Sequence, residues 1–352
     1  MSGKRSFTWL IVAAVCVAGG YYARGVVAPD GDGSTDASNA GPAKVDFIVG
    51  GPDDFYKVII AGAEEAAEEF GVDLAVHIPG RDPSEQLKLL QNVSISPPDG
   101  LAISPIAPDS ESLTLSRLAT NSLVVTFDND APQSLRHCHV GTNNYEAGRA
   151  CAKAAKRALP DGGKIAVFIG DNERNNARER RRGFYDELLD QSSLPDTGAY
   201  PPEKEVDGNG FTIVGTYLDD QNPEKAKANA EKALEAHPDL DGLIGLYGYN
   251  GPACLEVVRE AEKLGAIKIV AFDEEEETLQ GVADGHIHAT VVQDPYEYGY
   301  ESVRLLVTLH ARAADSIPIG GAGTVYLPVK VIEQDGIEEH RKKLADRKPQ
   351  AS

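Results

Sequence analysis

From about residue 44 onward the chain alternates short apolar runs of strand length with amphipathic runs of helix length. Parallel strands need a crossover connection, usually a helix, so this alternation predicts mainly parallel sheets with helices on both faces. The expected strands are residues 45–49, 72–77, 100–103 and 124–127 in a first series, and 164–169, 211–217, 242–245, 269–272 and 289–292 in a second. The expected helices include 56–70, 83–92, 146–158, 223–237, 253–264 and 295–312. The predicted fold class is α/β.

Two series of strands favour two similar doubly wound parallel-sheet lobes over one wide sheet, and 352 residues are enough for two cores. The chain is expected to cross between the lobes near residues 141–143, 293–294 and 323–328. The predicted first lobe is 44–142 plus 294–323, and the second is 143–293 plus 324–337. We interpret 191–210, which lacks periodicity, as a surface loop and 338–352 as a charged tail.

The N-terminus has the pattern of a targeting segment. Lys4 and Arg5 precede a largely apolar run over residues 7–22, so we interpret 1–28 as a signal peptide or a signal anchor. Cleavage after Ala28 and retention as a membrane anchor both stay open. Residues 29–43 are rich in Gly, Asp, Ser and Ala and are expected to form a flexible tether. The remainder of the chain is therefore predicted to be periplasmic or otherwise extracytoplasmic.

The charge balance excludes one class of partner. Lys and Arg number 34 and Asp and Glu 55, which gives a formal net charge of −21 at pH 7. Phosphate backbones require a basic surface, so we expect no nucleic-acid partner.

The cysteines and histidines give no sign of a metal or cofactor. Four cysteines are too few and too scattered for a disulfide scaffold, although a pairing of Cys138 with Cys151 stays open. In the segment His137-Cys138-His139 a strand would place the two histidines on one face and the cysteine on the other, and no second ligand group follows at zinc spacing. The sequence therefore predicts no metal site and no cofactor.

Polar and aromatic residues occur where the predicted strands end. In open α/β sheets these carboxyl ends gather at one crevice, where ligands bind. The candidate ligand-binding residues are Asp53, Phe55, Tyr56, Asp128, Arg178, Tyr249, Asn250, Asp273 and Gln293. A flat ring can cover the C–H face of a sugar, a carboxylate can accept two hydroxyl donors, and a carboxamide can both donate and accept. This set suits a neutral polyhydroxylated molecule and contains no evident nucleophile, so no catalytic residue is predicted.

Arg178 is the arginine that we expect at the site. It lies in the opening turn of a helix with an apolar face through Ala177 and Phe184, and it shares a flank with Tyr185. Its fork of donors could hold two ligand oxygens. The neighbouring arginines, 174, 180, 181 and 182, are interpreted as solvated or paired with nearby acidic residues. Five arginines also permit an anionic ligand such as a phosphate, but two carboxylates in the same crevice would repel it.

In several motifs the chain resembles the periplasmic sugar-binding proteins of the ribose/galactose type, the solute receptors of ABC transporters. The resemblance covers roughly residues 44–332. It rests on Phe55-Tyr56 before a helix with Ala61-Gly62-Ala63, on GTNNYEAG at 141–148, on ARERRRGF at 177–184, on Phe272-Asp273 and on ATVVQ at 289–293. By motif position the family's stacking aromatics fall on Phe55 and Tyr56, its carboxylates on Asp128 and Asp273, its arginine on Arg178 and its glutamine on Gln293.

The resemblance implies a type I periplasmic-binding-protein fold, a two-lobed clamp with a three-strand hinge. It also implies a monomer that captures a neutral monosaccharide or polyol and delivers it to the membrane permease of an ABC importer, without enzymatic activity. Which of Tyr249 and Asn250 takes the place of the family's asparagine stays open. Asn129 stands where ribose receptors tend to have an arginine.

Three other functions are considered, a signalling receptor, a transcription regulator and an exported enzyme. A sugar receptor that feeds a sensor kinase or chemotaxis system is compatible with the same residues. A transcription regulator would need a helix-turn-helix where this chain has its export signal. An exported enzyme would use Asp128 and Asp273 as acid and base.

Overall fold

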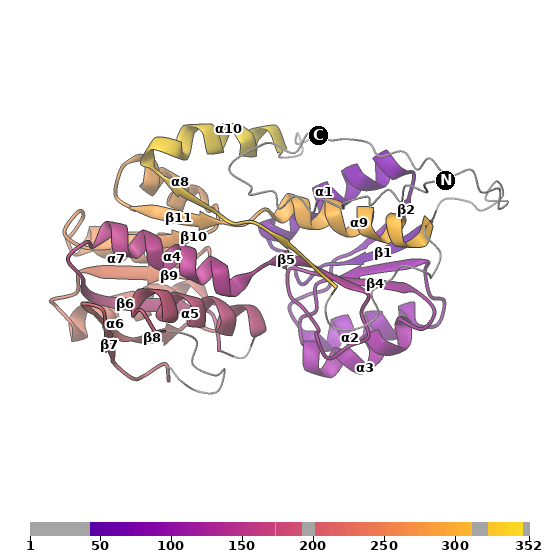
Figure 1. Cartoon of the computed structure of the whole chain (residues 1–352), viewed down its shortest axis with the longest axis horizontal. Coiled ribbons are helices and arrows are strands. Elements are labelled where there is room, and N and C mark those ends of the chain that lie inside the picture. Colours follow the sequence, from indigo (N-terminus) through magenta and orange to yellow (C-terminus); the bar gives the residue numbers. More distant parts are fainter. Residues whose placement is uncertain (1–42, 173, 192–200, 312–322, 348–352) are drawn as a thin grey trace, which may run out of the picture. The chain divides into compact units, whose positions relative to one another are not determined.

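The computed structural model describes residues 43–172, 174–191, 201–311 and 323–347. The predicted signal segment and nearly all of the predicted tether lie outside these residues. The described part contains two sheets with helices on both faces (Figure 1). This arrangement confirms the predicted α/β class.

The first sheet is parallel throughout and has the strand order β12-β5-β4-β3-β1-β2. Its strands are β1 (Lys44–Ile48), β2 (Asp73–His77), β3 (Gly100–Ile103), β4 (Leu123–Phe127), β5 (Cys138–Thr142) and β12 (Thr324–Leu327). Its helices are α1 (Asp54–Phe70), α2 (Pro83–Val93), α3 (Pro108–Leu118) and α9 (Pro295–Ala311). We call this sheet with its helices the first lobe.

The second sheet has the order β13-β11-β10-β9-β6-β8-β7, and its two edge strands are antiparallel to their neighbours. Its strands are β6 (Gly163–Ile169), β7 (Val206–Gly208), β8 (Phe211–Leu218), β9 (Gly242–Gly245), β10 (Lys268–Phe272), β11 (Ala289–Val292) and β13 (Lys330–Glu333). Its helices are α4 (Asn144–Ala158), α5 (Asn175–Leu188), α6 (Pro223–Ala236), α7 (Asn250–Glu260), α8 (Glu276–Ala283) and α10 (Ile337–Arg347), with a 3-10 turn η1 (Gln334–Gly336). We call this sheet with its helices the second lobe.

Each sheet has a separate apolar core on each face, because successive side chains of a strand point to opposite sides. In β1, Phe47 packs with α1 and α9, whereas Ile48 packs with α2 and α3. In the second lobe α4 and α5 cover one face, and α6, α7 and α8 cover the other. Two-sided burial explains why these strands are continuous apolar runs in the sequence.

The chain passes between the two sheets at three places, and the third differs from the prediction. The first two lie between β5 and α4 and between β11 and α9. The prediction placed residues 324–337 entirely in the second lobe, but β12 pairs with β5 in the first sheet and only β13 pairs with β11. Val325 and Leu327 pack against the first-lobe core, so the passage falls at Pro328-Val329.

Two segments expected to be irregular contain regular structure. The predicted charged tail from residue 338 is mostly helix α10, whose Ile337 is buried in a second-lobe core with Leu344 against it. In the predicted loop 191–210, β7 forms a short hairpin with β8. The apolar residues that fix these elements are few, so neither segment shows a clear period in the sequence.

Reciprocal glycine contacts join one helix pair in each lobe. A Cβ atom at Gly62 of α1 would overlap the carbonyl of Tyr296, and one at Gly299 of α9 would overlap the carbonyl of Ile59. In the second lobe Gly148 of α4 lies against the carbonyl of Arg180 in α5, and Gly183 lies against that of Tyr145. The backbones of each pair therefore pack in direct contact.

We expect Gly148→Ala to lower the free energy of unfolding by about 1–3 kcal/mol, because a methyl group at this position overlaps rigid backbone of α5. Urea denaturation measures the change. Gly336→Ala is the matched control, because a Cβ there meets no atom within 4 Å. Equal stability of the two variants would contradict the close α4–α5 contact.

Candidate functional site

Asp128 and Asp273 occupy equivalent positions in the two lobes. Each is the first residue after a central strand, β4 or β10, and each has φ = 59°. The backbone N–H of Asp128 donates to the Val140 carbonyl at 3.0 Å, and that of Asp273 to the Val291 carbonyl at 2.9 Å. Residues other than glycine rarely adopt this left-handed conformation, and such strain is typical of functional sites. The predicted carboxylates thus lie at the strand ends of both sheets.

The Asp128 carboxylate is held by hydroxyl groups of its own lobe. Its Oδ2 accepts from Ser104 Oγ at 3.0 Å and from the Tyr56 hydroxyl at 3.1 Å. Burial raises the pKa of Asp128, and these two bonds together with the charges of Arg180 and Arg174 oppose that rise. Ser104, which follows β3, was not among the predicted residues.

Asp53, Phe55 and Tyr56 lie at the start of α1. Phe55 is half-buried and packs edge-on against Tyr56, with ring centroids 5.4 Å apart. Asp53 occupies the N-cap position without a capping side-chain bond and instead forms an ion pair with Arg81. The aromatic pair therefore adjoins Asp128, whereas Asp53 lies at a more exposed edge.

The structure buries Arg180, whereas the sequence prediction selected Arg178 for the site. Arg178 is exposed, whereas Arg180 is buried, with 3% of its surface accessible. Arg180 lies three residues after Ala177 and four before Phe184, so it shares the buried stripe of α5 with them. The sequence prediction interpreted Arg180 as solvated or paired with a nearby acidic residue, although its spacing from Ala177 and Phe184 indicates the buried stripe.

The Arg180 guanidinium contacts several segments of the chain. Nη2 donates to Asn144 Oδ1 at 2.8 Å and to Gln293 Oε1 at 3.3 Å, and Nη1 donates to the Leu246 carbonyl at 2.8 Å. The guanidinium carbon lies 4.2 Å from the centroid of the Phe272 ring. All of these partners are uncharged, so the positive charge remains available to the nearby carboxylates.

Gln293 connects Asp273 to the passage between the sheets. Its Nε2 donates to Asp273 Oδ1 at 2.8 Å, and its Oε1 accepts from the Tyr298 hydroxyl of α9 at 3.1 Å. The Tyr298 hydroxyl also hydrogen-bonds Thr142 at the end of β5. Burial raises the pKa of Asp273 to about 6, against the lowering effect of Arg180 and Gln293.

Tyr249 and Asn250, both predicted to bind ligand, make hydrogen bonds inside the second lobe. Asn250 Oδ1 accepts from the Tyr247 backbone N–H at 3.0 Å, and its Nδ2 donates to Asp219 Oδ2 at 2.8 Å. The Tyr249 hydroxyl donates to the other Asp219 oxygen at 2.5 Å. These contacts fix the loop after β9.

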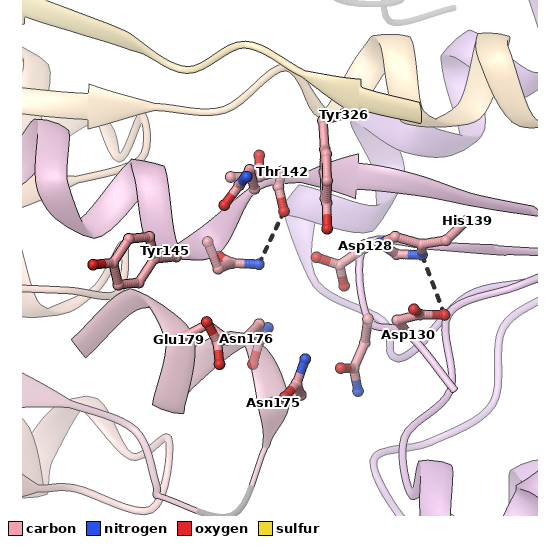
Figure 2. Close-up of a pocket in the computed structure, with 12 residues that line it drawn as sticks. Asp128, Asp130, His139, Thr142, Tyr145, Asn175, Asn176, Glu179 and Tyr326 are labelled. Carbon is pink, nitrogen blue, oxygen red and sulfur yellow. Dashed lines mark hydrogen bonds and ion pairs between the residues drawn. The ribbon is translucent and has the colours of Figure 1, made fainter. Parts of the chain in front are cut away.

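A pocket of about 160 Å³ lies beside Asp128 and is lined by residues of both lobes (Figure 2). Its lining residues are all polar: Asp128, Asn129, Asp130, His139, Thr142, Asn143, Asn144, Tyr145, Asn175, Asn176, Glu179 and Tyr326. At roughly 30 Å³ per water molecule it has room for about five waters, or one small polar molecule. Of the predicted residues only Asp128 lines this pocket.

Three carboxylates line this pocket, and two of them are ion-paired with arginines outside the lining, Asp130 with Arg136 and Glu179 with Arg182. Asp128, Asp130 and Glu179 line it, and none of the described residues lining it is Lys or Arg. Burial lowers the pKa of His139 to about 4, so this ring is uncharged at neutral pH. An anion would meet carboxylates here, whereas hydroxyl groups would meet acceptors.

The described residues give no support for a metal site, a disulfide or a membrane-spanning helix. They contain no group of three or more His, Cys, Asp or Glu side chains that could hold a metal ion. Cys138, Cys151 and Cys254 are buried and unpaired, so the possible Cys138–Cys151 disulfide is not formed. No helix in the part of the chain that the structure describes is long and apolar enough to cross a membrane.

We expect Arg180→Met to raise the pKa of Asp273 above its value of about 6, because a nearby cation that favours the ionised carboxyl is lost. Carbon-13 NMR titration of the aspartate carboxyl groups measures this change. Arg178→Met is the control and should leave the titration close to that of the wild type. A larger effect from Arg178→Met than from Arg180→Met would instead support the sequence prediction, which placed Arg178 at the site.

The chain is similar in sequence and in structure to known periplasmic binding proteins. Residues 46–312 match the model of the periplasmic binding protein domain. The ribose import binding protein of Haemophilus influenzae is 23% identical over 283 residues, which cover 80% of this chain and 87% of that protein.

Two solved structures give the same result. An ABC transporter solute-binding protein from Burkholderia graminis, in complex with D-arabinose, is 27% identical with a TM-score of 0.74 and covers 85% of this chain and 98% of its own. The glucose-galactose binding protein of Geobacillus stearothermophilus is 25% identical with a TM-score of 0.73 and covers 84% and 99%. The chain therefore belongs to the periplasmic binding protein family and has the two-lobed type I fold of its sugar-binding members.

Proposed function

We propose that this protein captures a neutral monosaccharide or polyol between its two lobes. The observation that carries the proposal is that a carboxylate stands at the end of a central strand in each lobe and that the charge of one buried guanidinium acts on both. Hydroxyl groups of a sugar can donate to Asp128 and Asp273 and accept from Arg180. The half-buried rings of Phe55 and Tyr56 supply an apolar surface for the C–H face of the sugar.

The ligand is neutral rather than anionic. The pocket beside Asp128 has no Lys or Arg among the lining residues that the structure describes, and its Asp128 carboxylate accepts from hydroxyl groups, whereas Asp130 and Glu179 are ion-paired with Arg136 and Arg182. A phosphate group would be repelled there. The names of the relatives and structural neighbours, which mention ribose, arabinose, glucose and galactose, support a sugar of pentose or hexose size.

The second part of the proposal is delivery to the permease of an ABC importer. The relative of Haemophilus influenzae is named an import binding protein, and the Burkholderia structure is named a transporter solute-binding protein. In this proposal residues 1–28 export the chain or anchor it, 29–43 form a tether, and the monomeric receptor works outside the cytoplasm without catalysis.

Closure of the lobes accompanies binding in this proposal. We assign residues 44–142 and 294–327 to the first lobe, and 143–293 and 330–347 to the second, with hinges at the three passages. The Tyr298 hydroxyl, which bonds both Thr142 and Gln293, links two of these passages to Asp273. Rotation about a few hinge residues leaves both cores intact.

Thermal unfolding with a panel of D-ribose, D-allose, D-arabinose, D-xylose, D-galactose, D-glucose and sorbitol tests the proposal. At a free concentration one hundred times Kd, the bound sugar should stabilise the protein by about 2.7 kcal/mol. Ribose 5-phosphate and amino acids are the negative controls. Stabilisation by these controls, with none by the neutral panel, would refute it.

Variants of the two arginines refine this test. Arg180→Ala should weaken binding of the stabilising sugar by more than about 2 kcal/mol, because buried partners of the guanidinium lose their donor. Arg178→Ala, at an exposed position of the same helix, should bind within about 0.5 kcal/mol of the wild type. Calorimetric titration compares them, and the reverse ranking contradicts the assignment.

Binding should also depend on pH through Asp273. Its pKa is about 6 without ligand, and sugar hydroxyls donate to the ionised carboxyl, so binding lowers that pKa. Affinity should therefore rise as the pH increases through about 6 and level off above about 7, with proton release on binding near pH 6. Titration calorimetry in buffers of different ionisation enthalpy measures this release. Asp273→Asn should remove this part of the pH dependence, whereas proton uptake by the wild type would contradict the role of Asp273.

A further inference from the structure

Tyr247 lies at the centre of the second-lobe strand ends, two residues after the end of β9. The strands on either side of β9 are β10, which leads into Asp273, and β6, which leads towards α5 and Arg180. The carbonyl of Leu246, the residue before Tyr247, accepts from Arg180 Nη1 at 2.8 Å. Gly248, the residue after it, lies beside the Asp273 side chain. Tyr247 is therefore placed between the two second-lobe groups of the proposed sugar site.

The Tyr247 side chain is held in one position. Its backbone N–H donates to Asn250 Oδ1, which Asp219 orients in turn. Its ring occupies the space that a Cβ atom at Gly170 would need, so only glycine at that position leaves room for it. The Arg180 guanidinium lies 5.6 Å from the ring centroid. A ring fixed in this way directs its hydroxyl group to a single place.

The hydroxyl of Tyr247 is buried and has no hydrogen-bond partner among the described residues. This is unusual, because a buried polar group without a partner destabilises the protein that contains it. The hydroxyl of Tyr249, two residues later, does have a partner in Asp219. Charged groups of both lobes act on the Tyr247 hydroxyl, including Asp128 of the first and Asp171, Arg174 and Arg180 of the second. The Tyr247 hydroxyl can both donate and accept a hydrogen bond, so it could bind a hydroxyl group of a bound molecule.

We propose that the Tyr247 hydroxyl hydrogen-bonds the captured sugar and that Asn250 and Asp219 are positioning residues for it. This inference rests on the proposed function and assigns specificity to a residue outside the predicted set. Because a phenol hydroxyl both donates and accepts, it matches a neutral sugar hydroxyl. A sugar that lacks the matching hydroxyl would leave Tyr247 unpaired and would bind less well.

Tyr247→Phe tests the inference, because it removes the hydroxyl and leaves the ring. Calorimetric titration uses whichever of D-ribose, D-allose, D-arabinose, D-xylose, D-galactose, D-glucose and sorbitol binds the wild type most tightly, and thermal unfolding is measured without sugar. The expected result is binding weaker by about tenfold or more, with an unliganded melting temperature equal to or above that of the wild type. Tyr249→Phe is the matched control, and its unliganded melting temperature should fall because Asp219 loses a donor.

The outcomes separate the inference from the proposed function. Unchanged affinity in Tyr247→Phe, with binding by the wild type, overturns the inference and leaves the proposed function standing. A lower unliganded melting temperature in Tyr247→Phe also overturns it, because the hydroxyl would then have a partner within the protein. If the wild type binds none of these seven neutral compounds, the proposed function fails and the inference fails with it.

Discussion

The burial of the Arg180 guanidinium is the interaction on which the rest of the site depends. A charge that is 3% exposed needs hydrogen-bond acceptors and opposite charge close by, since neither is supplied by water. Its acceptors come from Asn144 at the start of α4, Leu246 just after β9 and Gln293 just after β11. The same charge lowers the pKa of both Asp128 and Asp273 against the effect of their burial. One side chain thus joins the strand ends to the two carboxylates.

The two lobes use the same construction to hold their functional groups. In each lobe a pair of helices packs backbone against backbone through two glycines, Gly62 with Gly299 and Gly148 with Gly183. The first pair carries Tyr56 and Tyr298, and the second carries Arg180. Close packing of this kind fixes the helix termini, and with them the side chains that project toward the strand ends. In each lobe the aspartate is the first residue after a central strand and itself has the left-handed backbone conformation.

Much of the fold could be predicted because strands buried on two faces are short apolar runs with clear ends. Strands β3, β9 and β11 begin and end at the predicted residues. The strand-end positions of Asp128, Asp273 and Gln293 follow from the same pattern. Strand β12 was assigned to the wrong lobe because its apolar residues are compatible with either sheet, and only the pairing with β5 decides between them. Helix α10 is anchored mainly by Ile337 within a highly charged segment.

Arg180 and Tyr247, which we propose for the site and which the sequence prediction did not select, share a physical reason for that. Arg180 and Tyr247 are polar groups buried by tertiary structure, and a single sequence gives each of them a plausible exposed position. Asn250 has the residue type of a ligand contact, but both ends of its carboxamide are used within the lobe. Whether a polar side chain is buried, and whether its hydrogen-bonding atoms are already used within the lobe, depends on contacts between loops that follow different strands. Neither composition nor periodicity reveals these contacts.

A crystal structure of the protein with its best-binding neutral sugar tests the central claim most directly. The account predicts one sugar between the lobes, with oxygen atoms within hydrogen-bonding distance of Asp128, Arg180 and Asp273. A sugar bound elsewhere, or one bound between the lobes without contact to Arg180 and to both carboxylates, would contradict it.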